Sequence, residues 1–289
     1  MSGVKKTFEP GLPDRWWRLL IIVLFIVVPT LSATASVLVS PTVVFVDEAS
    51  RTGRLTLHNP TDKAQEVSIR FAFGLPTTDS LGKITVAFQD SAVTDPRSAL
   101  EWVKAFPRKV IVGANESQTV RVMVNPPPDL PDGEYWARVM VRSQDANQDL
   151  PSAEDGQIAT HLTMVTEMAI MLKYRTGELF SSLELSGSKT QLLDSTVEVW
   201  LDLTNLGNVS YMGVLQLWLR DSRGQEMDHF QTNLAVYRTQ NRRFELRVPA
   251  GEFQPPYQVD VNISSEDRTD IDDRDLIAGN KIAVSLAAE

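Results

Sequence analysis

The stretch QIATHLTMVTEMAIMLKY, residues Gln157–Tyr174, decides the fold of this chain. Every second residue of it is large and mostly apolar, and the positions between are small, polar or mixed. The first set is Ile158, Thr160, Leu162, Met164, Thr166, Met168, Ile170, Leu172 and Tyr174. Such alternation is typical of a β-strand, because successive side chains point to opposite faces of a sheet. A helix would bring Ile158, His161 and Leu162 together without forming an apolar stripe. The stretch therefore predicts a strand.

The predicted strand is unusually long. At about 3.3 Å per residue it spans roughly 59 Å, whereas a typical strand has about 5–6 residues. One interpretation is a long last strand of a domain that bends, with its two halves in different surroundings. The other is an edge strand whose overhang presents Ile158, Leu162 and Met164 to the sheet of a partner chain. The alternation is compatible with both.

The N-terminus has the features of an export signal. Four basic residues precede the apolar run Leu19–Val28, and the small residues Ala33-Thr34-Ala35 follow it. This order predicts a secretory signal peptide, residues 1–35, cleaved after Ala35. Ten apolar residues are too few to cross a bilayer, which needs about 20, although an uncleaved N-terminal anchor is an alternative. We expect a periplasmic protein in a bacterial envelope.

Charge and cysteine content exclude several classes of function. The chain has a formal net charge of -9 and contains no cysteine. An acidic protein is a poor ligand for nucleic acid or for an anionic membrane surface. The lack of cysteine excludes thiol catalysis and thiolate-bound metal, and an exported chain without disulfides must be held together by an ordinary apolar core.

Short alternating segments separated by turn sequences recur before Thr176. They are Val37–Val46, Arg54–His58, Val67–Phe73, Lys109–Val112, Thr119–Val124, Tyr135–Val141 and the long strand. Pro41 interrupts the first of them, so that strand either lies at a sheet edge or breaks in two. Seven short strands with almost no helix predict an immunoglobulin-like sandwich over residues 36–176.

The pattern repeats after Thr176-Gly177-Glu178, which we interpret as a hinge. Further alternating segments follow, namely Val197–Leu203, Val214–Leu219, Leu234–Tyr237, Arg243–Val248 and Tyr257–Ile263. They predict a second, smaller β-sandwich over residues 177–289 with an acidic C-terminal tail. Whether the last apolar run, Ile277–Leu286, pairs with this sandwich stays open. The expected fold is all-β, two immunoglobulin-like sandwich domains after an N-terminal signal peptide.

No residue pattern indicates catalysis or a metal. The acidic cluster Asp270–Asp275 lacks the glycine and the closing glutamate of a calcium loop, which favours a solvated loop. His58, His161 and His229 have no paired ligand spacing. Sequence motifs for a nucleophile elbow, a zinc-binding helix or a phosphate loop are missing. We expect no enzyme, cofactor, metal or small-molecule substrate.

Five short motifs stand in a characteristic order before the long strand. They are SPTVVF (Ser40–Phe45), RLTLHNP (Arg54–Pro60), FPRKV (Phe106–Val110), QTVRV (Gln118–Val122) and DLPDGEY (Asp129–Tyr135). In this order and spacing they resemble the N-terminal domain of the periplasmic pilus-assembly chaperones, the PapD-like family, and particularly its archaic branch. The resemblance covers about Val37–Glu178.

The resemblance implies a function for the long strand. Such chaperones pair their last first-domain strand with an incomplete pilus subunit and fill its groove with alternating apolar side chains, which is β-augmentation. The inserted residues would be Ile158, Leu162, Met164, Met168 and Ile170. The implied partners are a secreted fibre or pilus subunit and an outer-membrane usher. The alternative is a structural or adhesive envelope protein built of the same domains with no client; a secreted hydrolase is a third reading.

The carboxylate anchor of the family is missing from its usual places. These chaperones hold the subunit's C-terminal carboxylate with an arginine on the first strand and a lysine late on the long strand. The arginine is expected where Thr42 and Val43 adjoin, and neither of these residues is an arginine. Met171 stands where the lysine is expected. Lys173 and Arg175 are the candidates for a substitute anchor. Arg175 matches an arginine that the family commonly carries, where a structural role at the domain junction is an equal alternative.

Overall fold

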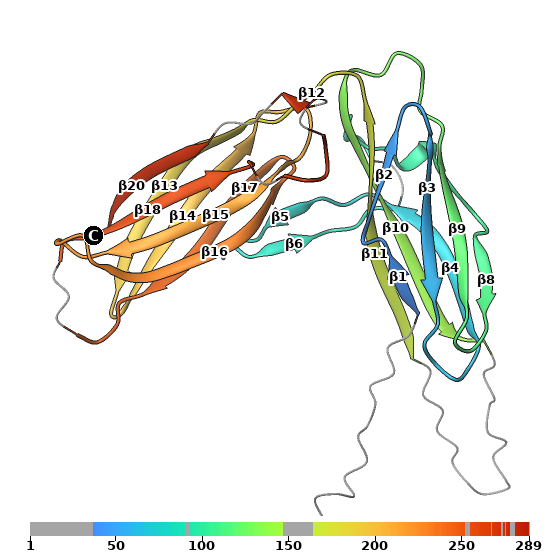
Figure 1. Cartoon of the computed structure of the whole chain (residues 1–289), viewed down its shortest axis with the longest axis horizontal. Coiled ribbons are helices and arrows are strands. Elements are labelled where there is room, and N and C mark those ends of the chain that lie inside the picture. The colour runs from blue at the N-terminus through green and yellow to red at the C-terminus, as the bar shows by residue number, and fades with distance from the viewer. Residues whose placement is uncertain are drawn as a thin grey trace, which may run out of the picture. The chain divides into compact units, whose positions relative to one another are not determined.

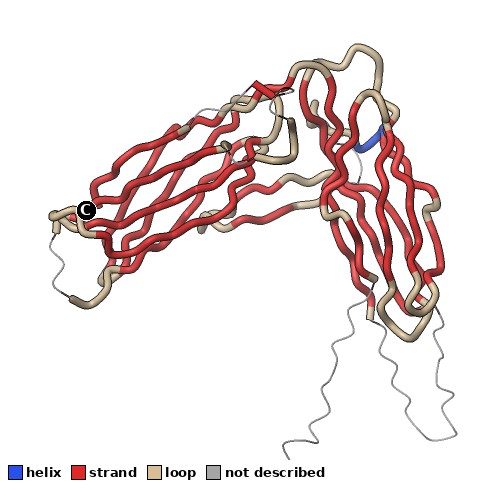
Figure 2. Tube along the Cα trace, viewed as in Figure 1, coloured by secondary structure: helices blue, strands red, loops and turns tan. Residues whose placement is uncertain are grey.

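The computed structural model describes residues 37–90, 93–146, 164–251, 255–266, 268–272, 274, 276–277 and 281–288 of the 289. Strands joined by loops make up nearly all of this part, and the 3-10 turn η1 (Leu100–Trp102) is the only helical element described there (Figure 2). The all-β prediction is confirmed. The predicted signal peptide, residues 1–35, lies outside the described residues. Within them, no helix is long and apolar enough to cross a membrane.

The first sandwich consists of two sheets, with the strand orders β1-β3-β9-β7 and β2-β11-β10-β4-β8 (Figure 1). Their strands are β1 (Leu38–Ser40), β2 (Val43–Asp47), β3 (Thr52–His58), β4 (Gln65–Ala72), β7 (Val103–Phe106), β8 (Lys109–Val112), β9 (Ser117–Val124), β10 (Gly133–Asp145) and β11 (Val165–Thr176). The prediction of an immunoglobulin-like sandwich without a disulfide is confirmed. Of the long predicted strand, Val165–Tyr174 is strand, and residues 157–163 lie outside the described residues.

The first strand changes sheets at Pro41, as the sequence suggested. β1 pairs antiparallel with β3 in one sheet, and β2 pairs parallel with β11 in the other. Because proline has no N–H to donate, the ladder of β1 cannot continue through Pro41. Two residues further on the chain has crossed to the opposite sheet. This crossing determines how much of β11 receives a second neighbour.

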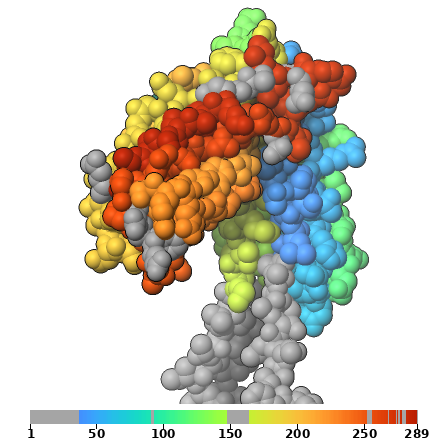
Figure 3. Space-filling view, turned by 60° about the vertical axis from the view of Figure 1, so that its left-hand side comes forward, coloured from blue at the N-terminus to red at the C-terminus, as the bar shows by residue number. Residues whose placement is uncertain are grey.

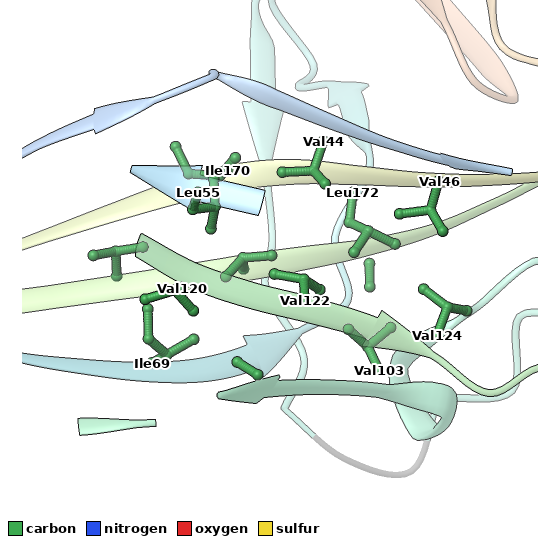
Figure 4. Close-up of a cluster of buried hydrophobic side chains, with 14 of the residues drawn as sticks. Val44, Val46, Leu55, Ile69, Val103, Val120, Val122, Val124, Ile170 and Leu172 are labelled. Atoms are coloured by element: carbon green, nitrogen blue, oxygen red, sulfur yellow. The ribbon is translucent and has the colours of Figure 1, made fainter. Parts of the chain in front are cut away.

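Alternating side chains of both sheets form the core of the first sandwich. Leu55 of β3, Val120 and Val122 of β9, and Leu172 of β11 are fully buried. Figure 4 shows Ile170 and Leu172 pointing into the same cluster as Leu55 and Val120. The large apolar face of the predicted strand is thus the inward face of its own sandwich along Ile170–Tyr174.

The second sandwich is formed by the sheets β13-β14-β17 and β16-β15-β18-β20. Their strands are β13 (Leu183–Leu193), β14 (Thr196–Asn205), β15 (Tyr211–Arg220), β16 (Glu226–Val236), β17 (Thr239–Arg247), β18 (Tyr257–Ser264) and β20 (Ile282–Ala288). β20 pairs antiparallel with β18, so the end of the C-terminal apolar run belongs to this sandwich. A separate buried cluster that includes Leu183, Leu217 and Val261 fills it.

Two small sheets complete the fold. The hairpin of β5 (Pro76–Thr78) and β6 (Ile84–Val86) contacts β17, where the backbone N–H of Asn241 donates to Thr78 Oγ1 at 2.9 Å. β12 (Leu179–Phe180) pairs with β19 (Leu276–Ile277). Residues 36–289 form one compact unit. The first core ends at Tyr174 and the second begins at Leu183; the domain limits 36–176 and 177–289 stay a prediction.

Candidate functional site

The first half of β11 has a neighbour on one side only. β10 pairs with β11 along its whole length, from Val165 to Thr176. On the other side β2 pairs only with Met171–Arg175. Among the described residues no strand covers that side of Val165–Ile170, which we call the open edge. Alternate residues of a strand direct their N–H and C=O groups to the same neighbour, so about half of these residues offer unpaired backbone groups there.

The apolar residues assigned to partner binding differ in accessibility. Met164, which precedes the open edge, is 72% exposed, and Met168 is half-buried. Ile170 is buried in the core of its own sandwich (Figure 4), so assigning it to a partner's groove is wrong for this structure. Ile158 and Leu162 lie outside the described residues. In Figure 3 the early residues of β11, in yellow-green, reach the molecular surface.

An ion pair fixes the outer face of the open edge. Glu167 accepts hydrogen bonds from Arg70 Nε at 3.0 Å and Nη2 at 2.9 Å, and Arg70 also donates to Asp90 at 2.6 Å. The hydrogen bonds from Arg70 hold the pKa of Glu167 below its usual range. Because Arg70 lies on β4, the ion pair reaches across β10 and connects the start of β11 to the third strand of the same sheet. The ion pair therefore links the first residues of β11 to β4 on the outer face of the sheet.

Further along β11, the candidate anchor Lys173 is bound inside the protein. Its side chain is 1% exposed. Its Nζ donates to Ser210 Oγ at 2.6 Å and lies 3.4 Å from Glu134 Oε1. Burial lowers the pKa of Lys173 despite the attraction of Glu134. Because Lys173 is buried, a partner's carboxylate could contact it only if the side chains that cover it moved aside.

The carboxylate of Glu134 lies at the centre of this cluster. Its Oε1 accepts hydrogen bonds from Trp136 Nε1 and from Ser210 Oγ, both at 2.6 Å, and its Oε2 accepts from Arg175 Nε at 2.8 Å. Burial by itself raises the pKa of Glu134, but Lys173, Arg175 and these hydrogen bonds outweigh it, and the pKa lies below its usual range. Glu134 is thus an internal carboxylate, fully buried and ionised.

Arg175 joins the cluster to the second sandwich. Its Nη1 donates to the Asp270 carbonyl at 2.6 Å, and its Nη2 pairs with the Asp270 carboxylate. Asp270 also accepts from Arg268 Nε at 2.6 Å. Burial would raise the pKa of Asp270, but Arg268 and Arg175 lower it to about 2. The prediction of a solvated acidic loop is therefore wrong for Asp270, whose side chain is only 15% exposed.

A shallow cleft of about 420 Å³ is lined in part by Arg175. Four carboxylates line this cleft, those of Asp47, Glu48, Asp270 and Asp272. They would repel an incoming carboxylate. The structural role of Arg175 is visible in its contacts, whereas the anchor role of Lys173 and Arg175 stays a prediction that has to overcome burial and repulsion.

The remaining polar residues of interest are dispersed. His58 Nδ1 lies 3.0 Å from Ser117 Oγ, and the ring of His229 stacks on Trp218; His161 lies outside the described residues. In the described part of the chain, no three His, Asp or Glu side chains are grouped so that they could hold a metal ion. Sequence reasoning missed Glu134 and Ser210. The pairing of Glu134 with Arg175 across β10 and β11 would have revealed the first, but it needs the register of the two strands.

The comparison with solved structures finds proteins that are described as chaperones. One match is described as the YadV chaperone, with 14% identity and a TM-score of 0.40, and covers 88% of this chain and 100% of that one. Another is the CupB2 chaperone of Pseudomonas aeruginosa, with 13% identity and a TM-score of 0.41, covering 87% and 100%. A third is the CsuC–CsuE chaperone–tip adhesion subunit complex from archaic pili of Acinetobacter baumannii, with 14% identity and a TM-score of 0.37, covering 72% and 89%.

No protein-family model matches the chain, and no curated protein matches it.

Proposed function

We propose that this chain is an exported, non-enzymatic chaperone that caps subunits of a surface fibre by donating its strand 157–174. The open edge is the observation that carries the proposal. A strand held by β10 on one side and uncovered at Val165–Ile170 on the other is able to accept one further strand. The sequence motifs of the first sandwich supply the class of partner, a secreted fibre or pilus subunit, with an outer-membrane usher as a further expected partner.

Strand donation would draw on two kinds of contact at this edge. Backbone groups along Val165–Ile170 would gain hydrogen bonds, each worth about 0.5–1.5 kcal/mol net. Met164 is largely exposed, and its complete burial would contribute about 1.5–3 kcal/mol before ordering costs. Met168 would add less because it is already half-buried. Ile158 and Leu162 continue the same alternation toward the N-terminal end of the strand.

In this proposal the client is held without the usual carboxylate anchor. Lys173 and Arg175 neutralise Glu134 and Asp270. Their contacts hold β11 against Glu134 of β10 and against Asp270. The client is then recognised by backbone pairing and apolar pockets alone. The expected location is the periplasm, which the predicted signal peptide supports.

The test is capture of a purified fibre subunit encoded beside this gene. We expect Leu162→Glu with Met164→Glu to abolish capture, because two charges would enter the client's apolar groove. The control is Leu192→Glu with Leu193→Glu, which places the same charges on two exposed leucines of β13. Capture that survives the first pair of substitutions as well as it survives the second would refute strand donation.

A structural or adhesive envelope protein with no client is the second candidate. One observation favours it: the candidate anchor residues are already neutralised by internal carboxylates. The two candidates differ in their effect on the fibre subunit. Deleting the gene should leave the periplasm depleted of intact subunit if the chain is a chaperone, and should leave the subunit level unchanged if the chain has no client.

A further inference from the structure

The outer face of the sheet β1-β3-β9-β7 is basic, although the chain as a whole carries a net charge of -9. The inward positions of these strands are the buried ones, among them Leu55, Val103 and Val122, so the alternate positions face outward. The outward residues are Leu38, Ser40, Thr52, Arg54, Thr56, His58, Lys104, Phe106, Ser117, Thr119, Arg121 and Met123. No aspartate or glutamate occurs among them. We call this surface the basic face.

Two arginines stand directly opposite each other on this face. Arg54 of β3 and Arg121 of β9 are partners in the antiparallel ladder, and both are exposed. Opposite side chains in such a ladder have Cβ atoms about 4.5–5.5 Å apart, and like charges at that distance are destabilising. Among the described residues no carboxylate forms an ion pair with Arg54, Arg121 or the nearby Lys104. The fold itself therefore leaves three adjacent positive charges uncompensated.

An exposed aromatic ring lies beside these charges. Phe106 of β7 is opposite Arg121 on the other side of β9, and it is 72% exposed. Lys104 is two residues away on the same strand, opposite Met123. Aromatic and arginine side chains that become buried together are the usual centres of binding energy at protein interfaces. Phe106 and the two arginines have this composition, on a surface whose other outward residues include several serines and threonines.

We propose that the basic face docks an acidic segment of a partner protein, with carboxylates on Arg54 and Arg121 and an apolar side chain against Phe106. Guanidinium groups bind carboxylates in bidentate geometry. Charge complementarity selects a protein segment over an anionic lipid surface. Three local positive charges attract a segment that lies within a Debye length of about 8 Å, whereas an extended anionic surface also meets the acidic remainder of the chain.

This docking surface is separate from the open edge. The basic face belongs to the sheet of β1, β3, β9 and β7, and the open edge belongs to the opposite sheet of the first sandwich. Sheets packed face to face lie about 10 Å apart. The two surfaces can therefore be occupied together, and the inference does not depend on the proposed strand donation.

The test is fluorescence anisotropy with a labelled peptide of six glutamates around a central tryptophan. We expect the full chain to bind it at about 10 mM salt and to bind it much more weakly at about 150 mM salt. Arg54→Glu with Arg121→Glu should weaken binding by about tenfold or more. The control, Lys63→Glu with Lys189→Glu, makes the same change in net charge at exposed lysines elsewhere and should retain binding. If the first variant does not fold, Arg54→Gln with Arg121→Gln replaces it.

A second measurement distinguishes arginines that bind a partner from arginines that are only exposed. Arg54→Glu alone creates an opposite-charge pair with Arg121, so the melting temperature should rise while peptide binding falls. A higher melting temperature with unchanged peptide binding would overturn the proposal. Vesicles with about a third of phosphatidylglycerol are the other arm: binding to these vesicles without binding to the peptide would overturn it in favour of a lipid surface.

Discussion

Replacing Glu134 by glutamine should be one of the most damaging single-atom changes in this protein. The substitution keeps the shape of the side chain and one oxygen acceptor, but it removes the negative charge that Lys173 and Arg175 share. Lys173 would then stay buried beside Arg175 without a carboxylate in contact. Breaking a buried pair by removing one partner typically costs about 3–5 kcal/mol. Because the amide keeps an acceptor for Trp136 or Ser210, we expect the lower end, about 3 kcal/mol.

The assay is urea unfolding followed by tryptophan fluorescence, since Trp136 donates directly to Glu134. With a slope of about 3 kcal/mol per molar, the unfolding midpoint should fall by about 1 M. Glu167→Gln is the matched control, because it makes the same chemical change in a pair whose partners are 42% and 34% exposed. Exposed pairs contribute about 0–1 kcal/mol, so its midpoint should hardly move.

A double-mutant cycle completes this test. Lys173→Met should also be destabilising, since it leaves Glu134 with one cation fewer. The double variant Glu134→Gln with Lys173→Met should cost less than the sum of the two singles by about 1–3 kcal/mol. If Glu134→Gln costs no more than Glu167→Gln, or if the two substitutions are additive, the buried cluster does not act as one electrostatic unit and the reasoning is refuted.

Two further predictions concern the same junction. The pKa of Asp270 is about 2 in the folded protein and 3.8 is its ordinary value, so its contribution is fully present above about pH 4 and is lost as the pH falls toward 2. It amounts to at most about 2.4 kcal/mol, and to about half of that after solvent screening. Asp270→Asn should flatten the dependence of the urea midpoint on pH in this window, and an unchanged slope would contradict this prediction. Gly177→Ala should destabilise the protein by more than Gly224→Ala. Both glycines have positive φ, +66° and +78°, but a Cβ at Gly177 would lie 1.9 Å from Asp132 Oδ1 and one at Gly224 meets nothing within 4 Å. The difference between the two melting temperatures therefore measures the cost of displacing Asp132, including its hydrogen bond from the Glu178 N–H, and equal losses would show that Asp132 moves aside freely.

Alternation predicted those strands whose inward side chains are apolar without interruption. Lys109–Val112 is the strand β8 with the predicted bounds, and Val214–Leu219 falls inside β15. β16 was predicted only at Leu234–Tyr237, whereas it begins at Glu226. Its first half, EMDHFQ, has no clear period of two, and pairing with β15 rather than its own sequence makes it a strand. β7 was missed because its outward Phe106 is larger and more apolar than its inward Ala105, so its four residues show no apolar alternation.

The site was predictable in part. The sequence suggested a strand with an overhang, and the break at Pro41 was read from the chemistry of proline. It could not show that β2 begins to pair at Met171, which sets where the open edge ends. The alternation also placed Lys173 on the face opposite Leu172. The partners of Lys173 are Ser210, which is 37 residues away in the sequence, and Glu134, which lies on β10. Only the folded chain brings these three residues together.

A single proline links the two surfaces. Because the ladder of the first strand stops at Pro41, β1 completes the sheet that carries the basic face, and β2 closes only the end of β11. If the first strand continued in the sheet of β11, it would cover the open edge. If it continued in the sheet of β3, it would leave that side of β11 uncovered along its whole length. Because of this crossing, Met171–Arg175 has a neighbouring strand on each side, whereas Val165–Ile170 has a neighbouring strand on one side only. Substitutions at Arg54 and at Met164 should therefore affect different partners, because the residues lie on opposite sheets that the same strand completes.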